Sequence, residues 1–421
     1  MRRATPLVLA LSIVATSFTG MPAFAAGFQL QEQTASGLGV AYAGMPAAAQ
    51  DAGTAFWNPA ALPLLDGVQA AAAVHYIDTS FDFSSQGPPP GGSTYHALGD
   101  GGDAGSGTTV PALYLTWRIQ ERLGIGLVID APFGLKTDWS VPWAGEFAGL
   151  RSEVKTLNVN PVVGYRINPH WLIGGGVSYQ RLKATLSNGV TPLIPTAIGT
   201  LDGDDWAFGW NAGVLFESGN GTHAGLTYRS TTDYKISGDL TFNNPALTAL
   251  QSNVSARLKL PQIVSVGVSQ KLGERTRLLV DASWTRWNTI QTLTIVATDG
   301  PRAGQVVANT PLNFENSWRA GLGGEYAITP QWLLRLGLAY DRSPVQDAFR
   351  TPRLPDEDRK WAAIGARFQP SDSWSIDAGY AHLWVRSASS DLSPVGAVPG
   401  FLRGSYDSSS DIVAAQASVR F

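Results

Sequence analysis

Histidines and the short motifs around serine are the first places to look for chemistry in this chain of 421 residues. Its histidines are His75, His96, His170, His223 and His382. No two of them have the His-Glu-x-x-His spacing of a zinc hydrolase. The chain also contains no Gly-x-Ser-x-Gly segment, the usual setting of an esterase serine, and no cysteine. These absences predict a protein that is not an enzyme.

One acidic run, Asp356-Glu357-Asp358, is the only segment that we consider as a metal site. Carboxylate oxygens are the ligands that divalent cations such as Ca²⁺ prefer. An acidic run is also the ordinary composition of a solvated loop, and that interpretation is the simpler one. We therefore predict neither a metal site nor a cofactor, and we keep cation binding at this run as an alternative.

The composition indicates which kind of scaffold carries these residues. Charged residues make up 15% of the chain, against roughly 25% in soluble proteins, whereas glycine and aromatic residues are abundant. Beyond the first 25 residues no apolar run approaches the ~18 residues of a membrane helix. A chain of this composition fits a closed transmembrane β-barrel best. The net charge of −3 predicts no nucleic-acid partner.

Alternation of apolar and polar residues supports the barrel. Leu278, Val280, Ala282 and Trp284 alternate with more polar neighbours, and similar stripes occupy 206–216, 332–341 and 374–380. Aromatic residues lie at the ends of these stripes, where barrels place their interfacial girdles. A soluble β-sandwich would also alternate and stays open as an alternative.

Connections of two lengths follow one another along the chain. Short turns lie at 120–122, 168–170, 218–221, 273–275, 328–330 and 369–372. Longer polar segments lie near 84–108, 140–150, 188–204, 243–253, 299–311, 344–358 and 388–405. Six short turns and seven long loops in strict alternation predict about fourteen strands, with both termini on the side of the short turns. Tight periplasmic turns and long external loops are typical of Gram-negative outer-membrane barrels.

The two ends of the chain agree with this location. Residues 1–25 have the charged start, apolar stretch and Ala-x-Ala ending of a secretory signal peptide. At the other end, alternation continues to the terminal Phe421, as expected of a strand that must pair with the first. A terminal phenylalanine also resembles the recognition signal of the barrel-assembly machinery, which we expect as a partner.

Residues 26–67 precede the first expected strand and lack sustained alternation. They are low in charge and include Phe28, Leu30, Phe56 and Trp57, so a disordered tether is a poor interpretation. We predict that this segment folds into the lumen as a hatch, followed by an antiparallel transmembrane β-barrel over 68–421. The whole is an all-β fold of about fourteen strands.

The chain resembles the FadL-type long-chain fatty-acid transporters of Gram-negative outer membranes. The resemblance covers essentially the whole chain after residue 25. It rests on short blocks in a shared order, which begin at residues 26, 36, 51, 58, 133, 143, 203, 226 and 355. No block is decisive alone, but their order and spacing are specific. The resemblance implies a fourteen-stranded barrel with an N-terminal hatch.

By this resemblance, a hydrophobic ligand enters between external loops and reaches a pocket beside the first hatch residues. It then leaves through a gap in the barrel wall. The residues implied for the pocket and hatch are Ala26, Gly27, Phe28, Asn58, Pro59 and Ala60. The last three of these are expected to brace the hatch against a kinked third strand.

That third strand contains its own marker. Residues 123–130 alternate well, and then Ala131, Pro132, Phe133 and Gly134 interrupt the pattern. Proline cannot donate a hydrogen bond to the strand ladder, so the wall should open there and offer a lateral exit. The alternative is that Pro132 simply begins an external loop.

A fatty acid also needs a partner for its carboxylate. The resemblance assigns this role to Arg181 and, next to it, Lys183, although both could be ordinary charges at the rim. A second basic position of the family corresponds to Glu315 here, which weakens the case for a carboxylate ligand.

We therefore expect a monomeric outer-membrane transporter that takes up hydrophobic molecules, most of all long-chain fatty acids. Membrane lipid and lipopolysaccharide surround it. An uptake channel for aromatic hydrocarbons is the main alternative. A barrel hydrolase and a general diffusion porin are weaker ones, since a hatch would block a porin.

Overall fold

The fold is described from a computed structural model that covers residues 27–87, 98–191, 193–392 and 402–421. The expected signal peptide, Ala26 and parts of three of the predicted loops lie outside these residues. No helix among the described residues is long and apolar enough to cross a membrane.

Four short helices precede the sheet. They are α2 (Ala35–Leu38), η2 (Met45–Ala47), α3 (Thr54–Trp57) and η3 (Pro59–Leu64). The strands of the first half are β1 (Val68–Ser85), β2 (Thr108–Gln120), β3 (Leu123–Asp130), β4 (Gly134–Asp138), β5 (Arg151–Arg166), β6 (Trp171–Thr191), β7 (Ile194–Glu217), β8 (Thr222–Arg229), β9 (Thr232–Phe242) and β10 (Ser252–Leu260). Those of the second half are β11 (Ile263–Leu272), β12 (Thr276–Thr285), β13 (Thr292–Ala297), β14 (Val306–Pro311), β15 (Ser317–Ala327), β16 (Trp332–Asp341), β17 (Arg359–Ser371), β18 (Trp374–Val385), β19 (Ala388–Leu392) and β20 (Leu402–Arg420). Helical turns in the loops between strands are η5 (Pro245–Leu250), η6 (Trp287–Thr289), η7 (Gly300–Arg302) and η8 (Asp347–Phe349).

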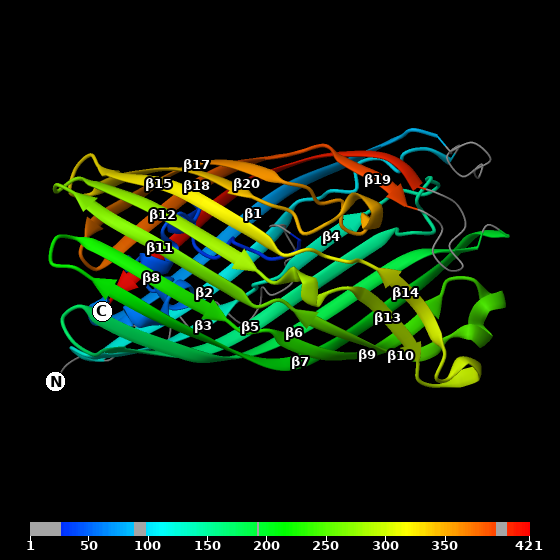
Figure 1. The fold of residues 1–421 in the computed structure, drawn as a ribbon, viewed down its shortest axis with the longest axis horizontal. Helices are drawn as coiled ribbons and strands as arrows, with labels where there is room; N and C mark the ends of the chain where they lie inside the picture. The colour runs from blue at the N-terminus through cyan, green and yellow to red at the C-terminus, as the bar shows by residue number, and fades with distance from the viewer. Residues whose placement is uncertain (1–26, 88–97, 192, 393–401) are drawn as a thin grey trace.

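Fourteen strands form one closed antiparallel ring, which confirms the predicted fold class. In ring order they are β1, β2, β3, β5, β6, β7, β8, β11, β12, β15, β16, β17, β18 and β20. The last strand pairs with the first from Gln69↔Arg420 to Ser85↔Gly404, so the barrel has no open edge along this seam. Figure 1 shows the tight turns gathered at one end and the helical turns and longer loops at the other.

The predicted apolar stripes face outward. Leu278, Val280 and Trp284 on β12 are among the exposed large side chains, whereas Leu279 and Asp281 face the interior and are buried. Exposure of these apolar side chains to water would be unfavourable, whereas contact with the hydrocarbon core of a bilayer is favourable. Alternation along each strand therefore places the lipid-facing surface and the lumen as predicted.

Several segments predicted as loops are strands that extend beyond the membrane. Residues 188–204 form most of a hairpin between β6 and β7, in which Leu186↔Leu201 and Asn188↔Gly199 pair. The strands β14 and β19 also lie in segments predicted as loops, and Figure 1 shows them with β9, β10 and β13 at the loop end of the barrel. Above the bilayer the outward face no longer has to be apolar. Alternation therefore disappears from the sequence although strand pairing continues.

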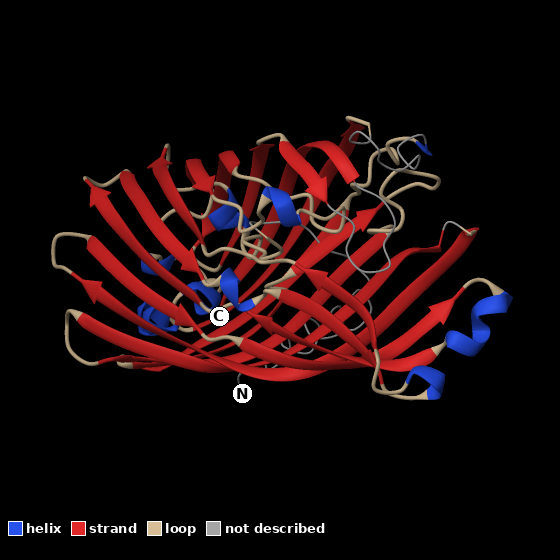
Figure 2. Cartoon of the chain, turned by 45° about the vertical axis from the view of Figure 1, so that its right-hand side comes forward, coloured by secondary structure: helices blue, strands red, loops and turns tan. Residues whose placement is uncertain are grey.

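Residues 27–67 lie inside the barrel, where Figure 2 shows their short helices enclosed by strands. Thr34 caps α2 through its side chain, and Asn58 caps η3. Ion pairs and hydrogen bonds fix this hatch to the wall. Asp51 pairs with Arg367 of β17 at 2.8 Å, and the side-chain amide of Gln50 donates to the carboxylate of Glu325 of β15 at 2.8 Å.

Glycines of the wall let the hatch backbone approach closely. A Cβ atom on Gly213 of β7 would collide with the side-chain oxygen of Asn58, and one on Gly337 of β16 would collide with the backbone of Val40. Gly225 of β8 stands in the same relation to the carbonyl of Pro46. We call these three residues the glycine sockets. They allow the hatch to be held by backbone contacts as well as by side chains.

Candidate functional site

The first described hatch residues run along the break in the third strand. The amide of Leu30 donates to the carbonyl of Pro132 at 2.8 Å, and the amide of Gly134 donates to the carbonyl of Phe28 at 2.9 Å. Gln29 and Phe133 form an isolated antiparallel bridge. The hatch therefore provides the pairing that the interrupted strand has lost.

Pro132 does not begin an external loop. The chain resumes as β4, which pairs with β5 from Gly134↔Lys155 to Asp138↔Arg151. The break at residues 131–133 therefore interrupts a strand that continues on its far side, and the loop interpretation of Pro132 is wrong.

Beside the break, residues 108–112 of β2 are not paired with β3 or β4, and we call this unpaired stretch of the wall the window. Below it, Leu113 of β2 pairs with Ile129 of β3. Above it, the amide of Asp138 donates to the carbonyl of Ala104 at 3.0 Å. Between these levels residues 108–112 pair with β1 alone among the described strands. The wall is thus unpaired over one short stretch beside Pro132.

Gln33 of the hatch bridges the two sides of this window. The hydroxyl of Tyr114 on β2 donates to the carbonyl of Gln33 at 2.8 Å. The side-chain amide of Gln33 in turn donates to the carbonyl of Ala131 at 3.2 Å. Gln33 itself is fully buried. The hatch therefore holds both sides of the unpaired stretch.

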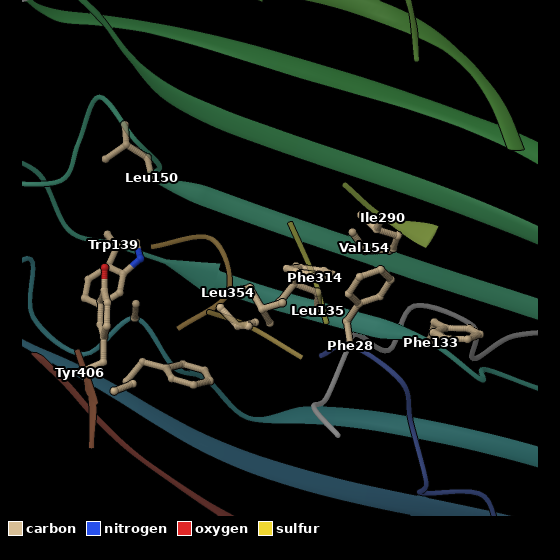
Figure 3. Packing of buried hydrophobic residues seen from close by; sticks show 14 of the residues in the cluster. Phe28, Phe133, Leu135, Trp139, Leu150, Val154, Ile290, Phe314, Leu354 and Tyr406 are labelled. Atoms are coloured by element: carbon tan, nitrogen blue, oxygen red, sulfur yellow. The ribbon is translucent and has the colours of Figure 1, made fainter. Parts of the chain in front are cut away.

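Phe28 lies at the centre of an aromatic cluster on the loop side of the hatch. Its ring contacts Trp287 edge-on at a centroid distance of 4.9 Å and Phe133 at 6.0 Å, and Trp287 contacts Phe314 at 6.0 Å. Figure 3 shows Phe28 between Val154 and Ile290 on one side and Phe133 on the other. Such ring pairs add specific geometry to ordinary apolar burial.

An apolar cavity lies against Phe28, and its empty space, including the part that is open to solvent, is about 980 Å³. Its lining comes from the hatch, β4, β5, β6, β7, β9, β10, β13, β14 and the loops before β15 and β17, and includes Phe28, Leu135, Val154, Leu186, Ile236, Leu258, Ile295, Phe314, Arg353 and Leu354. Because this lining is almost entirely apolar, the cavity offers a binding surface to an apolar molecule.

Asn58, Pro59 and Ala60 brace a different part of the wall from the one expected. The side-chain amide nitrogen of Asn58 donates to the carbonyl of Pro46 at 2.7 Å and to that of Val214 on β7 at 3.2 Å. Cβ atoms on Gly164 and Gly174 would collide with the backbone of Pro59 and Ala60. These three residues therefore fix the hatch to β5, β6 and β7, and residues 28–33 contact the break instead.

Arg181 and Lys183 face outward, which contradicts their predicted role inside the pocket. On β6 the inward residues are Gln180 and Leu182, whereas Arg181 and Lys183 are nearly half exposed. Arg181 pairs with Asp204 at 2.9 Å, and Lys183 pairs with Asp202 at 3.2 Å. Both cations therefore have an acidic partner on the outer surface of the barrel.

The acidic run binds groups of the protein itself. Asp356 accepts a hydrogen bond from the amide of Gly27 at 2.8 Å and pairs with Arg359. Glu357 pairs with Arg350 at 2.7 Å. Asp358 accepts from the hydroxyl of Tyr340. Among the described residues no group of His, Asp or Glu side chains is arranged to hold a metal ion.

Two further charged residues belong to this site, and neither was predicted as a site residue from the sequence. Arg353, in the loop before β17, lines the apolar cavity. Glu32, in the hatch beside the break, is completely buried, and neither carboxylate oxygen makes a hydrogen bond of ordinary geometry. Burial raises the pKa of Glu32 to about 8, although the nearby Arg359 acts against this shift. No sequence periodicity points to either residue, because both lie outside the strands.

Comparisons with known proteins support a common origin for this arrangement. A family described as "Outer membrane protein transport protein (OMPP1/FadL/TodX)" matches residues 16–421. The "Long-chain fatty acid transport protein" of Escherichia coli (strain K12) is 30% identical over 90% of this chain and 93% of its own length. The "47 kDa outer membrane protein" of Pasteurella multocida is 31% identical over 90% of this chain and 91% of its own.

Solved structures share the architecture. The crystal structure of a Pseudomonas aeruginosa FadL homologue superposes with a TM-score of 0.84 at 26% identity, covering 94% of this chain and 100% of that one. The Ralstonia pickettii toluene transporter TbuX superposes with a TM-score of 0.65 at 17% identity, covering 91% and 98%. The second likeness is one of fold.

Proposed function

The chain belongs to the OMPP1/FadL/TodX family of outer-membrane transport proteins, and we propose that the hydrophobic compounds it carries are long-chain fatty acids. Two relatives support this choice at the level of names, since the E. coli and Salmonella typhi proteins at 30% identity are called long-chain fatty acid transport proteins. Members of the family are transporters or channels, in line with the search for catalytic motifs above.

The observation that carries the proposal is the apolar cavity against Phe28. Each CH₂ group that leaves water for an apolar site gains ~0.8 kcal/mol, so a water-filled pore would offer a fatty acid nothing. The almost entirely apolar lining of this cavity offers a long alkyl chain a binding site. The cavity lies on the loop side of the hatch, so a ligand that enters between the external loops reaches the cavity first.

The contacts of the hatch support a route from this cavity through the barrel wall. The backbone of Phe28 is hydrogen-bonded to the far side of the strand break, and Gln33 bridges the window beside it. A ligand that displaces Phe28 would therefore pull on the segment that holds the window. We propose that this movement opens the window, so that the ligand leaves sideways through the wall and avoids the aqueous lumen.

Uptake of aromatic hydrocarbons is the second candidate, because Phe28, Phe133, Trp287 and Phe314 form an aromatic cluster next to the cavity. Rings of a bound hydrocarbon could pack edge-on against this cluster. The apolar lining extends over the hatch, β4, β5, β6, β9, β10 and β13, however, and a long alkyl chain would cover more of it than a single aromatic ring.

Uptake by cells distinguishes the two candidates. E. coli cells that lack their own long-chain fatty acid transport protein would express this chain and receive labelled palmitate or labelled toluene. Palmitate uptake above that of cells without the chain is expected, and Phe28→Ala should reduce it severalfold. The outward Phe208→Ala is the matched control, since Phe208 is exposed on the lipid-facing surface. Uptake of toluene without palmitate would contradict the proposal.

A further inference from the structure

Arg353 lies in the loop between β16 and β17 and reaches the ends of two wall strands. Its guanidinium donates to the hydroxyl of Ser152 at 3.1 Å, to the carbonyl of Arg151 at 3.3 Å and to the side-chain oxygen of Asn188 at 3.1 Å. All three acceptors are neutral. Among the described residues no carboxylate lies within ion-pairing distance of Arg353.

Other arginines of the same region are paired with acids. Arg350, three positions earlier, pairs with Asp347 and Glu357, and Arg359 pairs with Asp356. Burial without a counterion lowers the pKa of Arg353 to about 10, and no nearby acid acts against this shift. A guanidinium with this pKa still carries its charge at neutral pH. Arg353 therefore keeps an uncompensated positive charge.

Strand register places this charge at the external end of the apolar cavity. Ser152 of β5 and Asn188 of β6 face inward, each two residues beyond a residue that lines the cavity, namely Val154 and Leu186. Two residues of a strand advance roughly 7 Å. Phe28 lies on the opposite side, at the strand break, where its carbonyl accepts from the amide of Gly134 and the adjacent Phe133 donates to Thr156 of β5. The cavity thus runs from Phe28 at its hatch end to Arg353 at its loop end.

We propose that Arg353 binds the anionic head group of an amphiphile whose alkyl tail fills the cavity and ends at Phe28. This inference rests on the proposed uptake of hydrophobic molecules and specifies the chemical class of the ligand and its direction. A carboxylate matches a guanidinium because both are planar and can form two parallel hydrogen bonds. Arginine has five N–H donors, and the three recorded bonds leave donors available.

The apolar lining makes Arg353 decisive for the direction of binding. The lining contains Arg353, two threonines and Asp202, which pairs with Lys183, and its other residues are aliphatic, aromatic or glycine. A carboxylate placed near Phe28 would therefore be buried without a counterion. A carboxylate placed at Arg353 gains the guanidinium as its counterion. An amphiphile would therefore bind with its tail toward the hatch and its head toward the external loops, while a neutral hydrocarbon would gain nothing from Arg353.

The test compares two ligands with the same tail. Equilibrium binding of palmitate and of hexadecanol is measured on the full chain in lipid nanodiscs, for the parent protein, Arg353→Gln, Arg353→Lys and the control Arg257→Gln. Arg257 lies on the outer face of β10, 68% exposed, and pairs with Asp233. Arg353→Gln should weaken palmitate binding about tenfold or more and leave hexadecanol unchanged. Arg353→Lys should retain part of the preference for palmitate, and Arg257→Gln should bind both ligands as the parent does.

The outcomes separate this inference from the proposed function. If the parent protein binds both ligands equally well, the uptake proposal stands and the role of Arg353 is refuted. If Arg353→Gln loses both ligands to the same extent, Arg353 is structural and the inference is also overturned. If the parent protein binds neither ligand, the proposed function itself fails.

Discussion

The backbone amide of Gly27 donates a hydrogen bond of 2.8 Å to Oδ2 of Asp356, 329 positions further along the chain. The same carboxyl group accepts from the hydroxyl of Ser343 at 2.7 Å and pairs with Arg359. Asp356 lies in the loop that also carries Arg353. The hatch and the external end of the cavity are therefore connected through one buried carboxylate.

Removal of this link should loosen the first hatch residues. In Asp356→Ala the amide of Gly27 loses a charged acceptor, and such a hydrogen bond is worth ~1.5–3 kcal/mol. Hydrogen–deuterium exchange of the peptide that contains residues 27–33 is expected to become at least about tenfold faster. The control is Asp347→Ala in the same loop, because the side chain of Asp347 is 65% exposed and Arg350 keeps Glu357 as a partner. Equal exchange in the two variants would contradict the link.

The bridge made by Gln33 should control release through the window. Gln33→Ala removes the hydrogen bond to the carbonyl of Ala131, and the buried carbonyl then has no replacement from the side chain. Loss of a buried hydrogen bond costs about 1–3 kcal/mol, so dissociation of bound palmitate should accelerate roughly fivefold to a hundredfold. Stopped-flow displacement measures this rate. Gln69→Ala, at the start of β1, removes an exposed side-chain hydrogen bond to the carbonyl of Asp66 and should leave this rate unchanged. An unchanged rate in Gln33→Ala would exclude the window as the exit.

Glu32 should make the closed position of the hatch sensitive to pH. Its pKa is about 8 when buried and 4.5 when exposed, so the closed hatch binds one more proton between these values. The contribution of Glu32 to closure is complete below about pH 4.5 and is lost as the pH rises through about 8. The groups that act on Glu32 are Arg359 and Asp341 on the wall and Tyr42 in the hatch.

Exchange of hatch amides, corrected for the intrinsic effect of pH, should therefore be faster at pH 8.5 than at pH 5. Glu32→Gln keeps the shape of the side chain without a titrating proton, and it should abolish this difference. Glu121→Gln, an exposed residue of a short turn, serves as the control. A pH dependence that survives in Glu32→Gln would show that another group is responsible.

Arg181 should have no part in ligand binding. Because it lies on the outer face of β6 and pairs with Asp204, Arg181→Gln is expected to bind palmitate with the affinity of the parent protein. The measurement is the same nanodisc titration used for Arg353. A loss of affinity as large as that in Arg353→Gln would place the carboxylate outside the cavity.

The sequence could predict the barrel because the bilayer imposes a pattern on each strand. Stripes such as Leu278, Val280 and Trp284 record the lipid-facing surface directly. The same reasoning could have corrected the assignment of Arg181, since Trp171, Ile173, Val177 and Tyr179 share its strand face and are all exposed. That signal was present in the sequence, and the family resemblance outweighed it.

The role of Arg353 could not be found in this way. Its loop has no periodicity, and its position over Ser152 and Asn188 depends on contacts with strands nearly 200 residues away. Glu32 is a similar case, because its burial results from barrel closure around the hatch. Residues of this kind are specified by tertiary packing, and no local pattern of apolar residues marks them.

The glycine sockets Gly213, Gly225 and Gly337 limit how freely this molecule could be rebuilt from parts. At Gly225 and Gly337 the wall is shaped to the backbone of the hatch, and at Gly213 it is shaped to the side chain of Asn58. Glycine within a strand also weakens that strand, by roughly 0.5–1 kcal/mol relative to alanine. A chimaera that combines this barrel with a foreign hatch would keep the weakened strands without the contacts that offset them. Hatch and barrel wall are therefore fitted to each other, and neither can be exchanged without the other.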